Sequence, residues 1–153
     1  MKEHFLRLFQ HAAWADRRVL DKLRNQTPGN ERARTLFGHV LAAEKLWMTR
    51  LGGRDSSGIP VWPDLSLDEC AAWLEQNDAA YERFLDDLTE AGLDEVITYK
   101  NSKGIEYRTP VRDVLTHVAF HGTGHRGQVA TVLRDAGIEP ADTDFITFVR
   151  EIS

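Results

Sequence analysis

The stretch TPVRDVLTHVAFHGTGHRGQVATVLRDAG, residues 109–137, carries the strongest helical pattern in the chain. Its apolar side chains recur every three or four residues, the spacing of one stripe on an α-helix: Val114, Leu115, Val118, Val129, Val132 and Leu133. Thr109 is expected to cap this helix and Pro110 to take its first position, while Gly137 and Pro140 end it. The stretch therefore predicts a long amphipathic helix that needs partners to bury its stripe.

The same periodicity predicts three further helices, over residues 2–25, 36–51 and 66–90. The turn formers TPGN at 27–30 separate the first two, and the glycines at 52–53 end the second. Residues 54–65 contain two Pro, one Gly and two Ser, which predicts a loop. Ser66, followed three residues later by Glu69, predicts a capping box at the start of the third helix.

The region before residue 109 has a different texture. The β-forming residues 96–99 and the alternating residues 105–108 flank a turn at 101–104, so we expect a small hairpin there. A short helix over residues 142–151 is expected to close the chain. Four long helices with one apolar stripe each predict an all-α four-helix bundle, organised as a single domain over residues 1–153.

Composition excludes several classes of function. The chain has 153 residues, with 19 Lys plus Arg against 24 Asp plus Glu, and a formal net charge of −5. This acidic balance offers no basic surface for nucleic acid, and no apolar run is long enough to span a membrane. The single cysteine, Cys70, rules out an internal disulfide framework and a Cys-rich zinc site, and is expected in the core. The start of the chain lacks the apolar core of a signal peptide, so a cytoplasmic location is expected.

Three histidines at four-residue intervals, His117, His121 and His125, are the main chemical signal. Neighbours in this series can converge on one ion from a single helix face, but the outer two stand about 12 Å apart along the axis. Imidazole nitrogens bind zinc-like metals at about 2.0–2.1 Å, so one neighbouring pair must be chosen. The glycines at 122, 124 and 127 suggest space kept open near His121 and His125. His117 lies among apolar residues and is expected to pack or to form outer hydrogen bonds.

A third ligand can come from a facing helix. His39 lies beside the apolar stripe of the second helix and is expected to point inward. Three neutral imidazoles favour Zn or Ni, with Fe, Mn or Cu as alternatives, and they leave coordination positions open. His4 and His11 share one face of the first helix, but no other feature of the sequence supports a role for them at the site. Trp62 is expected to cover a pocket or a partner surface. No Glu stands three residues before any His, so the ferritin-like di-metal pattern is absent from the sequence.

The order of WAD at 14–16, GHVLAAEKLW at 38–47, ITYKNSKG at 97–104 and HVAFHGTGHRGQ at 117–128 resembles the DinB/YfiT-like family, which is distinct from the DNA polymerase of similar name. The resemblance implies an up-down-down-up bundle with a divalent metal held by three His. By position, those ligands are His39, His121 and His125. Relatives often carry Tyr-Asn where this chain has His11 and Ala12. The resemblance also implies a homodimer.

Activities in this family include metal-dependent thiol S-transfer, thiol-dependent isomerisation and hydrolysis. The resemblance therefore implies an enzyme that acts on a small-molecule substrate, with a low-molecular-weight thiol as co-substrate or with water. Glu44 is a candidate acid/base or outer-shell residue and Arg126 a candidate anchor for an anionic substrate, and both are equally well explained as solvated surface charges. The competing hypothesis is a non-catalytic helical module that binds a metal or a small molecule.

Overall fold

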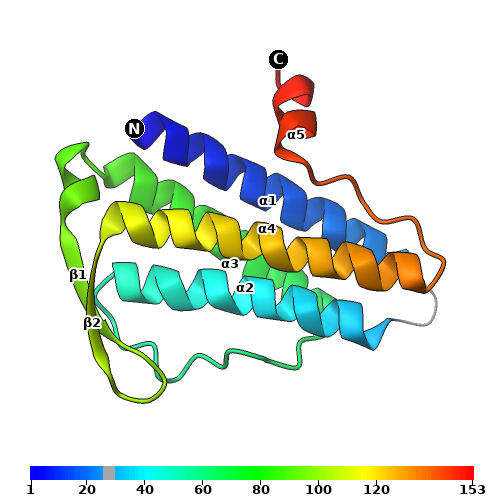
Figure 1. Ribbon diagram of the computed structural model, residues 1–153, viewed down its shortest axis with the longest axis horizontal. Coiled ribbons are helices and arrows are strands. Elements are labelled where there is room, and N and C mark those ends of the chain that lie inside the picture. The colour runs from blue at the N-terminus through cyan, green and yellow to red at the C-terminus, as the bar shows by residue number, and fades with distance from the viewer. Residues whose placement is uncertain (26–29) are drawn as a thin grey trace.

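The computed structural model describes residues 1–25 and 30–153. Within them, four long helices lie side by side: α1 (Lys2–Arg24), α2 (Glu31–Leu51), α3 (Leu67–Asp87) and α4 (Val111–Asp135). Helices α1 and α4 run in one direction and α2 and α3 in the other, so the up-down-down-up bundle is confirmed (Figure 1). Helix α2 packs mainly against α4 and α3, whereas α1 packs mainly against α3. The turn expected at residues 27–29 lies outside the described residues.

Helix starts follow the local chemistry of the sequence. The side chain of Asn30 accepts a hydrogen bond from the Ala33 backbone N–H and so caps α2. Ser66 and Glu69 form the reciprocal capping box that the sequence predicts for α3. Helix α3 ends at Asp87, three residues before the expected end, and a 3₁₀ turn, η1 (Ala91–Asp94), follows it.

The expected start of α4 is wrong by one residue. Thr109 and Pro110 belong to strand β2 (Glu106–Pro110), which pairs antiparallel with β1 (Val96–Lys100), and Pro110 is the residue that precedes the helix. The ladder extends this far because Pro110 pairs with Val96, and the Val111 N–H then donates to the Glu95 carbonyl. The hairpin itself is confirmed.

The C-terminal helix, α5 (Phe145–Glu151), begins three residues later than the sequence suggests. The Asp142 carboxylate accepts from the Asp144 N–H and the Thr147 hydroxyl, which closes a local turn before the helix. A short helix therefore closes the chain, as expected, but without its first turn.

The bundle core consists of two apolar clusters. One cluster includes Leu23, Phe37 and Leu133, and the other includes Phe9 and Leu115. Between them along the helices lies a polar layer with one buried residue from each helix: Asp16, Glu44, Asn77 and Arg126. Cys70 is fully buried in the first cluster, as expected.

Because α2 and α3 are parallel, the chain must return along the bundle between them. Residues 52–66, here called the crossing segment, make this return beside α2 (Figure 1). Leu65 and Ser56 anchor the crossing segment, since both are buried. The topology thus places irregular chain along α2, where it can form one wall of a site. None of the helices in the described residues is long and apolar enough to cross a membrane.

Candidate metal centre

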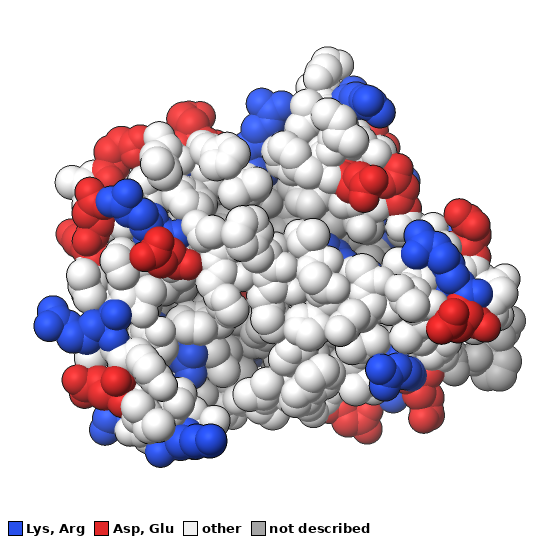
Figure 2. Space-filling model, in the orientation of Figure 1, with Lys and Arg blue, Asp and Glu red and all other residues white. Residues whose placement is uncertain are grey.

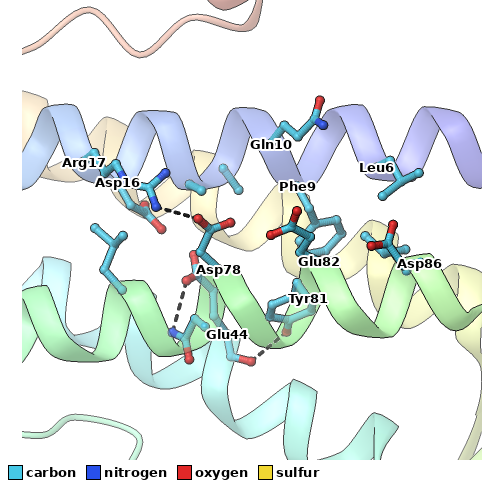
Figure 3. Close-up of a pocket in the computed structure, with 15 residues that line it drawn as sticks. Leu6, Phe9, Gln10, Asp16, Arg17, Glu44, Asp78, Tyr81, Glu82 and Asp86 are labelled. Atoms are coloured by element: carbon cyan, nitrogen blue, oxygen red, sulfur yellow. Dashed lines mark hydrogen bonds and ion pairs between the residues drawn. The ribbon is translucent and has the colours of Figure 1, made fainter.

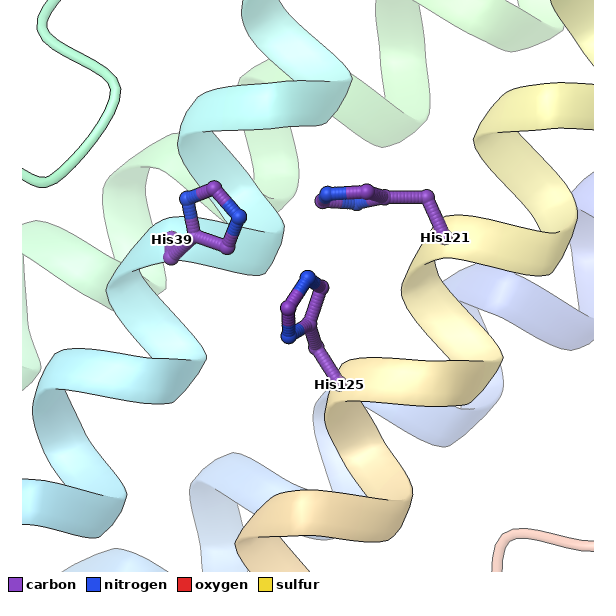
Figure 4. A group of neighbouring side chains, drawn as sticks. All are labelled: His39, His121 and His125. Carbon is purple, nitrogen blue, oxygen red and sulfur yellow. The ribbon is translucent and has the colours of Figure 1, made fainter.

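His39, His121 and His125 come together between two neighbouring antiparallel helices. His39 projects from α2 and the other two from α4, with the three rings facing a common space (Figure 4). One potential ligand atom from each side chain lies within 4.8 Å of the others. The ring centroids are 4.9 Å apart for His39 and His121, 4.6 Å for His39 and His125, and 4.4 Å for the α4 pair.

Hydrogen bonds orient two of the three rings. The Nδ1–H of His39 donates to the Val61 carbonyl in the crossing segment at 2.7 Å. The Nδ1–H of His125 donates to the Gln128 Oε1, one turn further along α4, also at 2.7 Å. Since Nδ1 carries the proton in both rings, each Nε2 keeps a free lone pair. Bonds of this kind fix the tautomer and direction of metal-ligating imidazoles.

Trp62 covers the site from the crossing segment. Its ring stacks on His39 with centroids 3.8 Å apart and planes 7° from parallel, and lies 6.3 Å from the ring of His125. Trp62 is still 53% exposed, so its outer face meets solvent. Trp62 thus stacks on one of the three histidines, and the expectation that it covers a pocket or a partner surface stays a prediction.

Burial favours the neutral form of His39 and His121. Desolvation, and then the charges of His125, His39 and His117, lower the pKa of His121 to about 4. Desolvation is also the main cause that lowers the pKa of His39, and the His125 charge adds to it. Neutral imidazole is the form that binds a metal, so these two side chains stay competent as ligands below their ordinary titration range.

The donor set fits a divalent metal. Three imidazole nitrogens at about 2.0–2.1 Å from a tetrahedral ion would be about 3.3 Å from one another. The separation within 4.8 Å therefore needs only a small approach of side chains that already face each other. Uncharged nitrogen donors suit Zn, Ni, Cu or Fe(II) better than the oxygen-seeking Mg or Ca.

The other histidines lie outside the group. The ring of His117 is 5.6 Å from that of His121 and contacts Trp47 at 5.3 Å, so it packs near the site, as expected. His4 is exposed near the start of α1. His11 is buried, and its Nε2–H donates to the Thr143 carbonyl at 2.8 Å, which holds the segment before α5 against α1.

Glu44 and Arg126 correct the sequence interpretation, because neither is a solvated charge. Arg126 is 3% exposed and donates to Asp16 at 2.8 Å, so it is neutralised inside the bundle and cannot anchor a substrate. Glu44 is 7% exposed and accepts from Asn77. Burial, and then the Asp16 charge, raise the pKa of Glu44 well above its ordinary value.

Glu44 faces a different cavity, of about 380 Å³, that lies mainly between α1 and α3 (Figure 3). The hydroxyl of Tyr81 donates to the Glu44 backbone carbonyl at 2.6 Å, and Arg17 bridges to Asp78 beside it. Both side chains that the sequence offered as neighbours of the metal thus belong to the interior of the bundle.

Gly122 of α4 has a different role from the expected one. A Cβ on Gly122 would approach the Arg126 Nη1 to 2.9 Å, so this glycine makes room for the buried guanidinium and not for a ligand. A Cβ at Gly124 or Gly127 would meet nothing within 4 Å, and the structure gives no reason for glycine at either position.

A cavity of about 490 Å³ adjoins the histidines. His39 and His121 line one part of it, and α2, the crossing segment and the hairpin supply the rest. On the face seen in Figure 2, charged side chains lie around the edge, and the middle, over α4 and α2, is largely uncharged. The volume is in the range of small-molecule sites.

Two contributors to the site escaped the sequence interpretation. Gln128 carried a usable signal, because it lies three residues after His125 and so on the same helix face. The Val61 carbonyl carried none, since any residue could supply a backbone oxygen there.

The fold and the three histidines on its second and fourth long helices place this chain in the class of four-helix bundles with a candidate metal site. The profile of the DinB family matches residues 1–151, and the chain belongs to that family. Protein DinB of Bacillus subtilis (strain 168) is 23% identical over 160 residues, with 95% of this chain and 93% of that protein covered.

A solved structure shows the same fold. The crystal structure of a DinB-like protein from Bacillus cereus ATCC 10987 matches with a TM-score of 0.63 and 18% identity, over 92% of this chain and 95% of the other. At this identity the likeness concerns the fold alone.

Proposed function

We propose that this DinB-family protein is a divalent-metal-dependent enzyme that activates a thiol or a water molecule for S-transfer or hydrolysis. The observation that carries the proposal is the group of three imidazoles, with ligand atoms within 4.8 Å, of which those of His39 and His121 line a cavity of about 490 Å³. A ligand group beside a cavity can bring a substrate to a metal, whereas a closed structural site has no room for one.

His39, His121 and His125 would hold the ion. A divalent ion bound by three neutral ligands keeps its full charge, which favours the deprotonated form of a bound water or thiol. The Val61 carbonyl and Gln128 hold two of the rings in the ligating tautomer. Trp62 shields His39 from water by stacking on it.

The finer identities are also proposals. We infer Zn or Ni as the native metal, ahead of Fe, Mn or Cu, and a low-molecular-weight thiol as the co-substrate. The substrate is then a small electrophile. A homodimer is a further expectation from the family, and sedimentation velocity would test it.

The test begins with metal analysis of untagged protein, because a His tag would add ligands. Thiol transfer is then followed with glutathione and 1-chloro-2,4-dinitrobenzene, and hydrolysis with p-nitrophenyl acetate. His39→Ala is the test variant and His117→Ala the matched control, since both remove one imidazole from the same region. We expect stoichiometric metal, and turnover that chelation and His39→Ala abolish but His117→Ala does not.

Other outcomes decide against the proposal in different ways. Stoichiometric metal without turnover of either substrate pair would favour the non-catalytic metal-binding module. Absence of metal binding at micromolar concentration would reject the metal-dependent enzyme and the metal-binding module, and would leave the small-molecule-binding module.

A further inference from the structure

One stripe of α2 lines the cavity from end to end. The cavity-lining residues of this helix lie at successive spacings of three, one, three, one and three: His39, Ala42, Ala43, Leu46, Trp47 and Arg50. The eleven residue steps from His39 to Arg50 cover about 16 Å along the axis. The cavity is thus elongated, with imidazole at one end, small and apolar side chains in the middle and a guanidinium at the other end.

The guanidinium of Arg50 is held in place by its surroundings. Its Nε–H donates to the Ser56 hydroxyl at 3.0 Å, and its Nη2 donates to the Lys100 carbonyl at 3.2 Å. The rings of Trp47 and Tyr99 lie 4.5 and 4.9 Å from its Cζ. These contacts use two of the five N–H donors and leave an edge of the fork available.

Arg50 is a buried cation for which the described residues provide no counter-ion. It is 8% exposed and forms no ion pair with a carboxylate of residues 1–25 or 30–153. Burial lowers the pKa of its guanidinium below the ordinary value, but an arginine stays charged. The acidic residue in the cavity lining, Asp55, is exposed, and its carboxylate accepts from the Ser57 N–H and hydroxyl.

The contrast with Arg126 is direct. Arg126 is buried even more deeply than Arg50, but Asp16 neutralises it at 2.8 Å. Burying a charge costs free energy unless the charge is paired. An unpaired, buried guanidinium that lines a cavity therefore favours the binding of an anion in that cavity.

We propose that this cavity binds a small carboxylic acid with an elongated apolar body, with the carboxylate on Arg50 and the apolar body directed toward His39 and His121. The inference deepens the proposed function, since it names the substrate class of that site. The apolar body would lie along Ala42, Ala43 and Leu46.

The chemistry favours a carboxylate over a phosphate. The free edge of a guanidinium fork matches the two oxygens of a carboxylate. One buried positive charge also balances one negative charge, whereas a phosphate dianion would bring a second, unpaired charge into the cavity. The other cation of the lining, Lys100, is exposed and cannot neutralise a buried group.

The experiment uses metal-free protein from which the chelator has been removed by desalting, so that neither a metal nor the chelator competes for the carboxylate. Hexanoate is titrated by calorimetry at pH 8, with hexanamide as the neutral control and inorganic phosphate as the alternative anion. We expect hexanoate to bind roughly 10- to 100-fold more tightly than hexanamide. Butanoate should bind roughly fourfold more weakly for each methylene lost.

Variants assign the effect to Arg50. Arg50→Met should remove the preference for hexanoate over hexanamide. The control variant is Arg54→Met, which removes an exposed arginine from the crossing segment and should change this preference less than twofold. If Arg50→Met fails to fold by circular dichroism, Ala43→Phe provides the second test, because it fills the middle of the cavity and should abolish hexanoate binding with Arg50 intact.

Equal affinity for hexanoate and hexanamide, or unchanged hexanoate binding in folded Arg50→Met, would overturn the inference. Tighter binding of phosphate than of hexanoate would overturn the carboxylate assignment. Metal binding is measured in a separate experiment. A negative hexanoate result therefore does not reject the proposed metal function, and a negative metal result does not change what the hexanoate titration shows.

Discussion

The bundle contains two clusters of polar side chains that differ in how they are satisfied. Asp16, Glu44, Asn77 and Arg126, one from each helix, form a buried layer whose polar atoms bond to other protein atoms. Among the described residues, no buried side-chain nitrogen or oxygen lacks a partner. The three histidines instead come from two helices, and two of them direct an unprotonated nitrogen toward a shared space.

The difference separates polar groups that are satisfied within the fold from polar groups that are left open to a ligand. The buried layer links all four helices and interrupts an otherwise apolar core, so it can fix their alignment along the bundle axis. The histidine cluster adds little to the fold, because each ring is held by one hydrogen bond or by packing. Variants in the two clusters should therefore change different measured quantities.

The largest effect on stability is expected for Arg126→Met. The change leaves the Asp16 carboxylate buried beside Glu44 without its counter-ion, so we expect a loss of about 3–5 kcal/mol in the free energy of unfolding. Urea denaturation of the metal-free protein measures it. The double variant Asp16→Leu with Arg126→Met should recover much of the loss, and a single-variant loss below about 1 kcal/mol would mean that the layer is not a structural pair.

His125→Ala should show the opposite pattern. Metal affinity should fall at least about 100-fold, because only two ligands remain, while the free energy of unfolding of the metal-free protein should change by less than about 1 kcal/mol. His117→Ala is the matched control and should lose less affinity than His125→Ala. Competition with a chromogenic chelator gives both affinities, and equal losses would point to His117 and His121 as the ligand pair.

Gln128→Ala tests the hydrogen bond behind His125. Loss of the acceptor frees the ring to rotate, so metal affinity should fall roughly 10- to 100-fold. Gln128→Glu keeps an acceptor at the same position and should retain the affinity. The same competition with a chromogenic chelator measures these metal affinities. Equal metal affinities for Gln128→Ala and the unchanged protein would show that Gln128 does not support the site.

The smallest effect is the response of the metal-free protein to acid. Because the pKa of His121 is about 4 in the folded chain and about 6.5 in an unfolded one, the unfolded state binds more protons between these values. Stability should therefore be complete above about pH 6.5 and fall as the pH drops toward 4, by about 1 kcal/mol from this partly hydrated group. Urea midpoints at several pH values measure the fall, and His121→Asn should flatten it. An unchanged slope in that variant would assign the loss to other groups.

The sequence predicted the elements and the convergence of the three histidines well. The helix stripes, the Ser66 capping box and the hairpin depend on local spacing, which a sequence displays directly. The pairing of His121 with His125 follows from one helical turn, and His39 from the need for a facing helix. Their service as metal ligands stays a prediction.

The burial and pairing of the interior charged residues could not be predicted from local sequence spacing. Arg126 lies one residue after His125, about 100° around the helix, and Glu44 lies five after His39, about 140° around, so neither shares a face with its histidine. That angle was available from the sequence, but the pairing of Arg126 with Asp16, 110 residues away, was not. Arg50 was missed because its significance depends on the lack of a carboxylate partner among residues 1–25 and 30–153, which only the packed structure reveals.

The crossing segment has a consequence for the kinetics of the site. Within the part of the chain that the structure describes, residues 55–65 form one backbone-to-backbone hydrogen bond, from Ile59 to Ser56, whereas the helices on either side are bonded throughout. A segment held this way opens locally at a lower free energy than the bundle unfolds. Opening would lift the Val61 carbonyl and Trp62 off His39 together. The exchange of a bound ion with solution should therefore keep pace with amide hydrogen exchange in this segment, and be far faster than amide exchange in α2 and α4.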